Sequence, residues 1–167
     1  MAVINQHERQ LAASAAETGA LLDTLANGND DRLWPRRWWP AMRFNQPGLA
    51  VGAHGGHGPI RYQITAYQPG RRVWFTFTGP KGFKGGHGFQ VTAQGGTTQL
   101  THTLKMTVHG LARITWPLVF RPLHNALIED SLWQAEMSLK TPGEQPPPRP
   151  GWSRWVKFLR WVLARVG

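Results

Sequence analysis

The sequence contains no cysteine, and this absence removes several classes of protein from consideration. Disulfide-stapled domains, thiolate zinc sites, iron–sulfur clusters and cysteine nucleophiles all require a thiol. Long apolar runs are also missing, since none approaches the roughly 18 residues that a bilayer-spanning helix needs. The opening residues MAVINQHERQ are polar where a secretion signal would be apolar. We therefore expect a cytoplasmic protein, and 167 residues are enough for one domain with a sizeable core.

Carboxylates are scarce, and this shortage makes the chain basic. Nine Asp and Glu accompany 19 Lys and Arg, which gives a net charge of +10. Segments 32–44 and 141–167 each carry +4, because the first holds four Arg and no acid and the second holds five cations and Glu144. Both segments also contain several Trp. Positive charge beside tryptophan suits an anionic membrane surface better than a nucleic-acid duplex, so we do not expect nucleic acid as a partner. The alternative is a single strand whose bases stack on the Trp rings.

The first elements are a strand and a helix. Residues 3–11 predict the strand. Ser14 and Glu17 have the spacing of a capping box, in which each side chain bonds to the backbone of the other residue. A helix of about ten residues should follow, and Asn27-Gly28 should end it.

Two hairpins are predicted in the middle of the chain, where apolar residues alternate with polar ones. The first turns at Pro69-Gly70 and the second at Gly95-Gly96. Centring each loop on its turn gives six cross-strand pairs with matched faces: Ala66–Val73, Ile64–Phe75, Tyr62–Phe77, Val91–Leu100, Phe89–His102 and His87–Leu104. In this register His87 and His102 are diagonal neighbours on the inner face of the second hairpin.

Helical periodicity returns after Gly110. Pro117 and Pro122 should kink or break this helix, so its regular part should run over 122–139. His124, Ile128, Ser131 and Ala135 form one stripe that could face a cavity, whereas Glu129 and Asp130 are expected at the surface. Residues 141–151 read as a proline-rich linker and 152–167 as a separate basic amphipathic helix.

Five segments resemble a known superfamily: LWPRRWWPAMRF, VGAHGGHGPIRYQITAYQPGRRVWFTF, GFKGGHGFQV, TQLTHTL and RPLHNALIED. Over residues 1–140 the chain resembles a bacterial branch of the START-related, polyketide-cyclase-like (SRPBCC) helix-grip proteins. The resemblance implies an α+β fold in which a curved antiparallel sheet surrounds a long C-terminal helix and encloses a cavity. It also implies a small hydrophobic ligand, lipid-like or polyketide-like, held by a carrier or sensor. Members also include aromatases, cyclases and dehydratases, so such an enzyme is the alternative.

The candidate ligand contacts lie on the inner faces of the two hairpins and of the long helix. They are Tyr62, Ile64, Phe75, Phe77, His87, Phe89, His102, Leu104, Met106, His124 and Ile128. His87, His102 and Tyr62 are also the candidate acid–base groups, because imidazole titrates near neutral pH. The alternative is that these histidines are core residues that backbone carbonyls or water satisfy.

His54 and His57 form an HxxH pair in the glycine-rich segment GAHGGHG. Such a pair can chelate a metal, but zinc usually takes a third protein ligand, and no Asp or Glu accompanies the pair. We therefore expect a flexible connection whose glycines serve tight turns, with a metal site as the weaker alternative. No cofactor is expected.

Two Trp-rich segments each have two interpretations. Trp38 and Trp39 either gate the cavity or pack under the edge of the sheet while the neighbouring Arg side chains reach solvent. The helix 152–167 either lies on an anionic membrane, peripheral to its inner face, or packs on its own domain or a partner chain. Its candidate contacts are Trp152, Trp155, Leu159, Arg154, Lys157 and Arg160.

Overall fold

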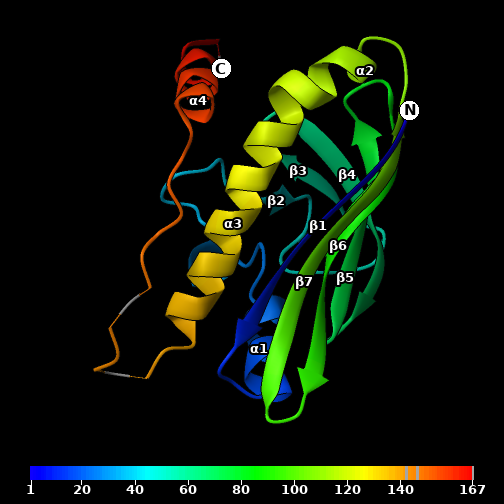
Figure 1. Ribbon diagram of the computed structural model, residues 1–167. Helices are drawn as coiled ribbons and strands as arrows, with labels where there is room; N and C mark the ends of the chain where they lie inside the picture. Colours follow the sequence, from blue (N-terminus) through cyan, green and yellow to red (C-terminus); the bar gives the residue numbers. More distant parts are fainter. Residues whose placement is uncertain (142, 146, 167) are drawn as a thin grey trace.

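The computed structural model describes residues 1–141, 143–145 and 147–166, and in these ranges seven antiparallel strands form one sheet. The order across the sheet is β1-β7-β6-β5-β4-β3-β2 (Figure 1). The strands are β1 (Ala2–Leu11), β2 (Arg43–Phe44), β3 (His54–His57), β4 (Ile60–Gln68), β5 (Arg72–Gly79), β6 (Phe83–Gln94) and β7 (Thr97–Val108). Pro142, Pro146 and Gly167, which belong to the predicted linker and tail helix, lie outside the described residues.

The helices lie on one side of this curved sheet (Figure 1). They are α1 (Ala15–Asp23), the 3₁₀ turn η1 (Gly28–Asp30), α2 (Ala112–Thr115), the π-helical turn η2 (Trp116–Phe120), α3 (Arg121–Ser138) and α4 (Arg154–Val166). The longest, α3, crosses the sheet, and α4 lies on the far side of α3 (Figure 1). Leu127, Ile128 and Leu132 of α3 are buried in the core between the helix and the sheet.

The capping box at the start of α1 is confirmed. The Glu17 N–H donates to Ser14 Oγ at 3.2 Å, and the Ser14 N–H donates to a Glu17 carboxylate oxygen at 2.9 Å. The predicted end at Asn27-Gly28 is wrong, because α1 stops at Asp23. The Asp31 carboxylate accepts the N–H of Ala26, which holds that residue at a φ of 61° and turns the chain earlier.

The register of the second hairpin is confirmed at all three predicted pairs. In the first hairpin, Tyr62 faces Phe77 and Ile64 faces Phe75 as predicted, but Ala66 faces Trp74 instead of Val73. The cause is a bulge between Ile64 and Ala66, which inserts one extra residue in β4.

The glycine-rich segment is a strand, and the expectation of a flexible connection is wrong. β3 pairs with β2 on one side and with β4 on the other. A Cβ on Gly55 would lie 2.0 Å from the Arg43 carbonyl oxygen, and one on Gly56 would lie 1.9 Å from that of Ile60. Glycine is therefore required here by the close approach of the neighbouring strands.

The predicted effect of the prolines, a kink or a break, takes the form of a π-helical turn inside a continuous run of helical residues. Pro117 lies in the π-helical turn η2, between the single turn of α2 and the long α3. Pro122 lies in the first turn of α3, where its missing N–H is tolerated. The regular helix runs from Arg121 to Ser138, one residue earlier at each end than predicted.

Candidate functional site

A cavity of about 420 Å³ lies between the sheet and α3. Strands supply Ile60, Phe77, Phe83, His87 and Leu104, while η2 and α3 supply Trp116, Val119, Phe120, Leu123, His124 and Leu127. Loop residues Trp39, Pro40, Gly58 and Pro59, the β3 residue His57, and Arg160, Leu163 and Ala164 of α4 complete the lining. The walls are thus largely apolar, as in sites for small hydrophobic molecules.

Exposure of the lining residues shows where the cavity opens. Pro40, Pro59 and Leu163 are exposed at the surface, so they mark the mouth. Leu104 and Trp116 are 1% and 3% exposed, so they mark the floor. The mouth therefore lies between the loop before β2, the β3–β4 turn and α4.

Four of the predicted ligand contacts line the cavity, namely Phe77, His87, Leu104 and His124. The others are buried in the core without lining it: Tyr62, Ile64, Phe75, Phe89, His102, Met106 and Ile128. The Phe44 ring explains part of this difference, because its centroid lies 5.9 Å from that of Tyr62 and 6.0 Å from that of Phe75. Phe44 therefore packs against the part of the inner sheet face that carries these two rings.

Sequence reasoning missed most of the helical and loop contribution to the lining. Trp116, Phe120, Leu123 and Leu127 recur at helical spacing, so their shared face was readable from the sequence. No sequence signal placed Leu163 or the other α4 residues here, because the linker carries them back from beyond the end of α3.

Three imidazoles, from β6, β7 and α3, lie next to one another, and those of His87 and His124 line the cavity. His87 Nδ1 lies 3.2 Å from His102 Nε2, and the ring centroids of His102 and His124 are 5.1 Å apart. Within the described ranges, His87 Nε2, His102 Nδ1 and both ring nitrogens of His124 are buried without a hydrogen-bond partner. Buried polar atoms are normally paired, and two of these unpaired imidazoles, His87 and His124, belong to side chains that line the cavity.

Burial keeps these imidazoles neutral. It lowers the pKa of His124 to about 3 and that of His57 to about 4, and it lowers the pKa of His87 and His102 well below the ordinary range. A neutral imidazole has one N–H donor and one acceptor nitrogen, so it can pair with a hydroxyl, a phenol or a carbonyl. Tyr62, whose pKa burial raises, hydrogen-bonds to His57 through an Oη–Nδ1 distance of 3.0 Å.

Asp130 is fully buried, which corrects the expectation that it lies at the surface. Its carboxylate accepts the indole N–H groups of Trp39 and Trp152, each at 2.8 Å. Arg149 in the linker adds two more donors, from Nε at 3.0 Å and from Nη2 at 2.8 Å. These partners replace the water that the charge loses, and they come from distant parts of the chain.

Glu129 is only half-buried, and its partners lie on β1. Its carboxylate oxygens lie 2.7 Å from His7 Nδ1 and 3.2 Å from Arg9 Nη2. The second nitrogen of His7 lies 3.2 Å from Asn125 Oδ1. This network fastens the edge strand β1 to α3.

Helix α4 packs on the domain through one face. Val156 and Leu159 are 4% and 7% exposed. The Arg160 guanidinium carbon lies 4.4 Å from the ring centroid of Trp39 and 4.6 Å from that of Trp152. Three of the predicted membrane or partner contacts, namely Trp152, Leu159 and Arg160, therefore face their own domain.

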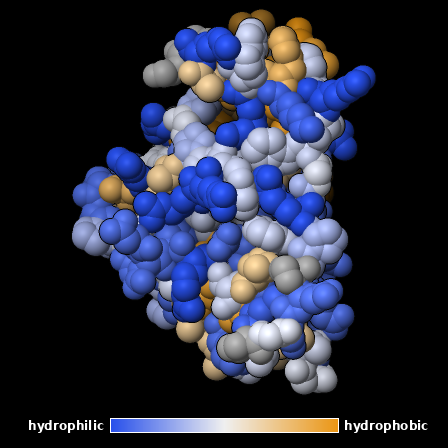
Figure 2. All heavy atoms as spheres, turned by 90° about the vertical axis from the view of Figure 1, so that its left-hand side faces the viewer, coloured by the Kyte–Doolittle hydropathy of each residue, from blue (hydrophilic) through white to orange (hydrophobic). Residues whose placement is uncertain are grey.

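The opposite side of α4 carries exposed aromatic rings. Trp155, Phe158 and Trp161 are 46%, 48% and 53% exposed, and successive ring centroids are 5.4 and 6.1 Å apart. The Trp155 indole N–H donates to the Leu118 carbonyl at 2.7 Å, which joins these rings to exposed residues of the α2–η2 region. We call the combined surface the apolar ridge: Leu111, Ile114, Leu118, Trp155, Phe158 and Trp161. Figure 2 shows hydrophobic side chains among basic ones at the end of the molecule that holds α4.

The HxxH pair is split by the strand. His54 is exposed, whereas His57 lines the cavity and lies against Trp34, with ring centroids 4.8 Å apart. Among the residues that the structure describes, no three His, Asp or Glu side chains are grouped so as to hold a metal ion. In the same part of the chain, no helix is long and apolar enough to cross a membrane.

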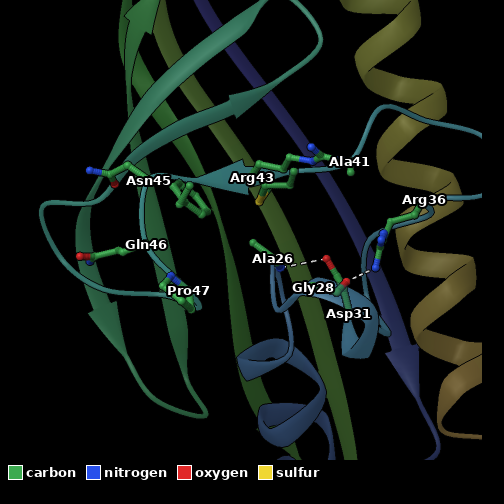
Figure 3. Close-up of a pocket in the computed structure, with 11 residues that line it drawn as sticks. Ala26, Gly28, Asp31, Arg36, Ala41, Arg43, Asn45, Gln46 and Pro47 are labelled. Carbon is green, nitrogen blue, oxygen red and sulfur yellow. Dashed lines mark hydrogen bonds between the residues drawn. The ribbon is translucent and has the colours of Figure 1, made fainter.

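A second hollow, of about 320 Å³, is more open and more polar (Figure 3). It lies between turn 26–31 and segment 41–47. The Asp31 carboxylate accepts the Ala26 N–H at 2.8 Å and two further backbone N–H groups, and Arg36 donates to a carbonyl of the same turn. These polar groups hold the loop together, so this hollow is the weaker candidate for a ligand site.

No family model matches the sequence, and no curated protein matches it. Solved structures do resemble the fold. CalU16 from Micromonospora echinospora has a TM-score of 0.55 at 13% identity, over 99% of this chain and 96% of that one. A truncated norcoclaurine synthase from Thalictrum flavum has a TM-score of 0.60 at 17% identity, over 84% and 96%. Ara h 8.0201 has a TM-score of 0.55 at 13% identity, over 83% of this chain and 97% of that one.

Identities this low show the fold alone. All three structures match across most of their own length, so the likeness covers the whole sheet-and-helix arrangement rather than one motif. The chain therefore has the α+β fold that its sequence predicts, a curved antiparallel sheet around a long C-terminal helix, and it shares this fold with CalU16 and Ara h 8.0201.

Proposed function

We propose that the protein binds a small hydrophobic ligand in the cavity between the sheet and α3, as a carrier or sensor. The observation that carries this proposal is the largely apolar cavity of about 420 Å³, whose wall includes the imidazoles of His57, His87 and His124. Leaving a buried polar group unpaired costs about 1–3 kcal/mol, so a ligand that pairs with it recovers part of that energy. The ligand class is thus an apolar body that carries one or two hydroxyl or carbonyl groups, as in lipid-like and polyketide-like molecules.

Native mass spectrometry of the purified protein tests this proposal directly, followed by titration with a panel of hydrophobic alcohols, ketones and phenols. Trp39 and Trp116 line the cavity, so saturable quenching of tryptophan fluorescence should report binding. Co-purification of a hydrophobic molecule, or one-to-one binding from the panel, supports the proposal. A protein that retains nothing and binds no member of the panel contradicts it.

A filled cavity provides the control. Leu123→Trp places a larger side chain on the cavity wall and should abolish quenching by the panel. Ile4→Trp adds the same side chain at a position of β1 that is 75% exposed, and it should leave binding unchanged. Thermal unfolding verifies that both variants are folded. Equal binding by both would place the ligand elsewhere.

Acid–base catalysis in the same cavity is the second candidate, and the specific observation in its favour is the position of His87 and His124 on the wall. Norcoclaurine synthase, of similar fold, is named as an enzyme. General bases work best with a pKa near the working pH, and burial takes the pKa of His124 to about 3. Binding is therefore the better supported function. Turnover of a bound ligand that is lost in both His87→Gln and His124→Gln would favour the enzyme.

The apolar ridge supports a further part of the proposal, which is contact with an anionic membrane during ligand exchange. The ridge carries aromatic rings that suit a bilayer interface, and it lies on the helix that forms part of the cavity mouth. Arg154, Lys157 and Arg113 are exposed on the same elements and supply charge opposite to that of anionic lipid.

A further inference from the structure

Arg160 is the charged side chain among the described residues that line the cavity. It lies on α4, one helical turn before the mouth residues Leu163 and Ala164. The rings of Trp39 and Trp152 contact its guanidinium and fix its position. A cation held at the mouth of an apolar cavity has already lost part of its hydration, so it gains from an anion that arrives there.

The chain itself does not supply that anion. In the part of the chain that the structure describes, the Arg160 guanidinium has no hydrogen bond or ion pair. Asp130 influences the Arg160 charge through space, as does Arg149 with the opposite sign. That carboxylate already accepts four N–H groups, two of them from Arg149, so its charge is compensated. The mouth of the cavity therefore retains one positive charge.

We infer that Arg160 is a binding site for the anionic group of the ligand, so that the preferred ligand is a hydrophobic carboxylic acid. This inference rests on the proposed function and narrows its ligand class. The carboxylate would lie at Arg160, and the apolar body would extend toward Leu104 and Trp116 on the floor. A carboxylate suits this cation because the planar guanidinium presents parallel N–H donors in its own plane while its faces contact the indole rings.

A matched pair of ligands isolates the charge. Dodecanoic acid and dodecan-1-ol share the same alkyl chain, and both are titrated into the full-length protein at pH 8 in low salt. A charge-assisted hydrogen bond strengthens binding by roughly ten- to a hundredfold, so the acid should bind more tightly by that factor. In Arg160→Gln the two affinities should become similar, through weaker binding of the acid alone.

Arg165→Gln is the control variant. Arg165 is a cation on the same helix whose guanidinium carbon lies 3.8 Å from the Trp161 ring centroid, but it does not line the cavity. This change should leave the preference for the acid intact. Arg160→Lys, which keeps the charge, should retain part of that preference.

Each other outcome overturns the inference in a distinct way. If the alcohol binds the unmodified protein as tightly as the acid, the cavity takes hydrophobic molecules but Arg160 does not select acids. If Arg160→Gln weakens acid and alcohol equally, Arg160 only holds α4 in place. If neither ligand binds and the hydrophobic panel also fails, the inference and the proposed function fall together.

Discussion

Arg149 and Asp130 form a two-pronged ion pair, with Nε donating to Oδ1 at 3.0 Å and Nη2 donating to Oδ2 at 2.8 Å. Asp130 has no exposed surface, so this carboxylate depends on Arg149 for its opposite charge. The pair joins the linker to the middle of α3, nineteen residues earlier in the chain. It therefore determines where the linker, and with it α4, lies on the domain.

Arg149→Ala should destabilise the protein by about 3 kcal/mol, because it leaves a buried carboxylate without its counter-charge. It should also release α4, which hydrogen exchange of residues 154–166 will detect as faster exchange. Urea denaturation gives the free energy of unfolding. Arg154→Ala, at an exposed position of α4, should change that energy by less than about 0.5 kcal/mol. Equal effects of the two substitutions would show that the ion pair does not hold the tail.

His124→Phe should weaken ligand binding without destabilising the empty protein. The substitution removes two buried ring nitrogens that have no partner within the described residues, so the melting temperature should stay the same or rise. Binding of a hydroxyl-bearing ligand should fall by about tenfold, since one hydrogen bond is lost. His109→Phe, at an exposed position outside the cavity, is the control. A fall in stability that matches the fall in affinity would indicate a structural role instead.

Stability should fall as the pH drops below about 6.5. The pKa of His87, His102 and His124 in the folded protein lies below 6.5, their ordinary value in the unfolded chain. The unfolded state therefore binds more protons below pH 6.5, and acidification favours unfolding. Each histidine adds a slope of up to about 1.4 kcal/mol per pH unit, and above pH 6.5 the contribution is constant.

Urea midpoints at pH 5, 6 and 7 measure that slope. His124→Phe should reduce it by the equivalent of one proton, whereas Ile4→Phe, at an exposed position with no titratable group, should leave it unchanged. A flat profile between pH 7 and pH 5 would mean that the imidazoles are hydrated in the folded protein.

The apolar ridge should carry membrane binding. We expect the protein to float with vesicles of phosphatidylcholine and phosphatidylserine and to stay behind with phosphatidylcholine alone, because the exposed cations add to the aromatic contacts. A triple Ser substitution at Trp155, Phe158 and Trp161 should abolish flotation. Ile4→Ser with Val51→Ser, at two exposed apolar positions outside the ridge, should leave flotation intact. Flotation that survives the triple substitution would remove the ridge from the proposal.

Local patterns predicted the two hairpins well but not β2 and β3, because a period of two and two glycine-containing turns determine which hairpin residues pair. They placed Phe89 opposite His102 and His87 opposite Leu104, as the structure has them. The bulge after Ile64 carries no such local signal, because it depends on how β4 fits its neighbours. The sequence pattern alone therefore could not predict the one-residue shift in the register of β4 against β5.

The candidate site was harder to predict, because distant segments complete it. Of the predicted stripe His124, Ile128, Ser131 and Ala135, His124 lines the cavity, whereas the other three are buried in the core without lining it. Asp130 is polar, so sequence reasoning placed it at the surface. Its burial depends on Arg149 and on two Trp side chains from other segments. Helical periodicity gives the face of a helix, but it does not identify the partner that will cover that face.

Three described residues of α4 form part of the cavity wall, so the position of this helix and the contents of the cavity are thermodynamically linked. A ligand that contacts Leu163 or Ala164 stabilises the docked position of α4. Undocking of α4 weakens ligand binding by the same free energy. Proteolytic cutting of the tail should therefore slow as the cavity fills. The rate of this cutting would report the fraction of protein that holds a ligand, whatever the identity of that ligand.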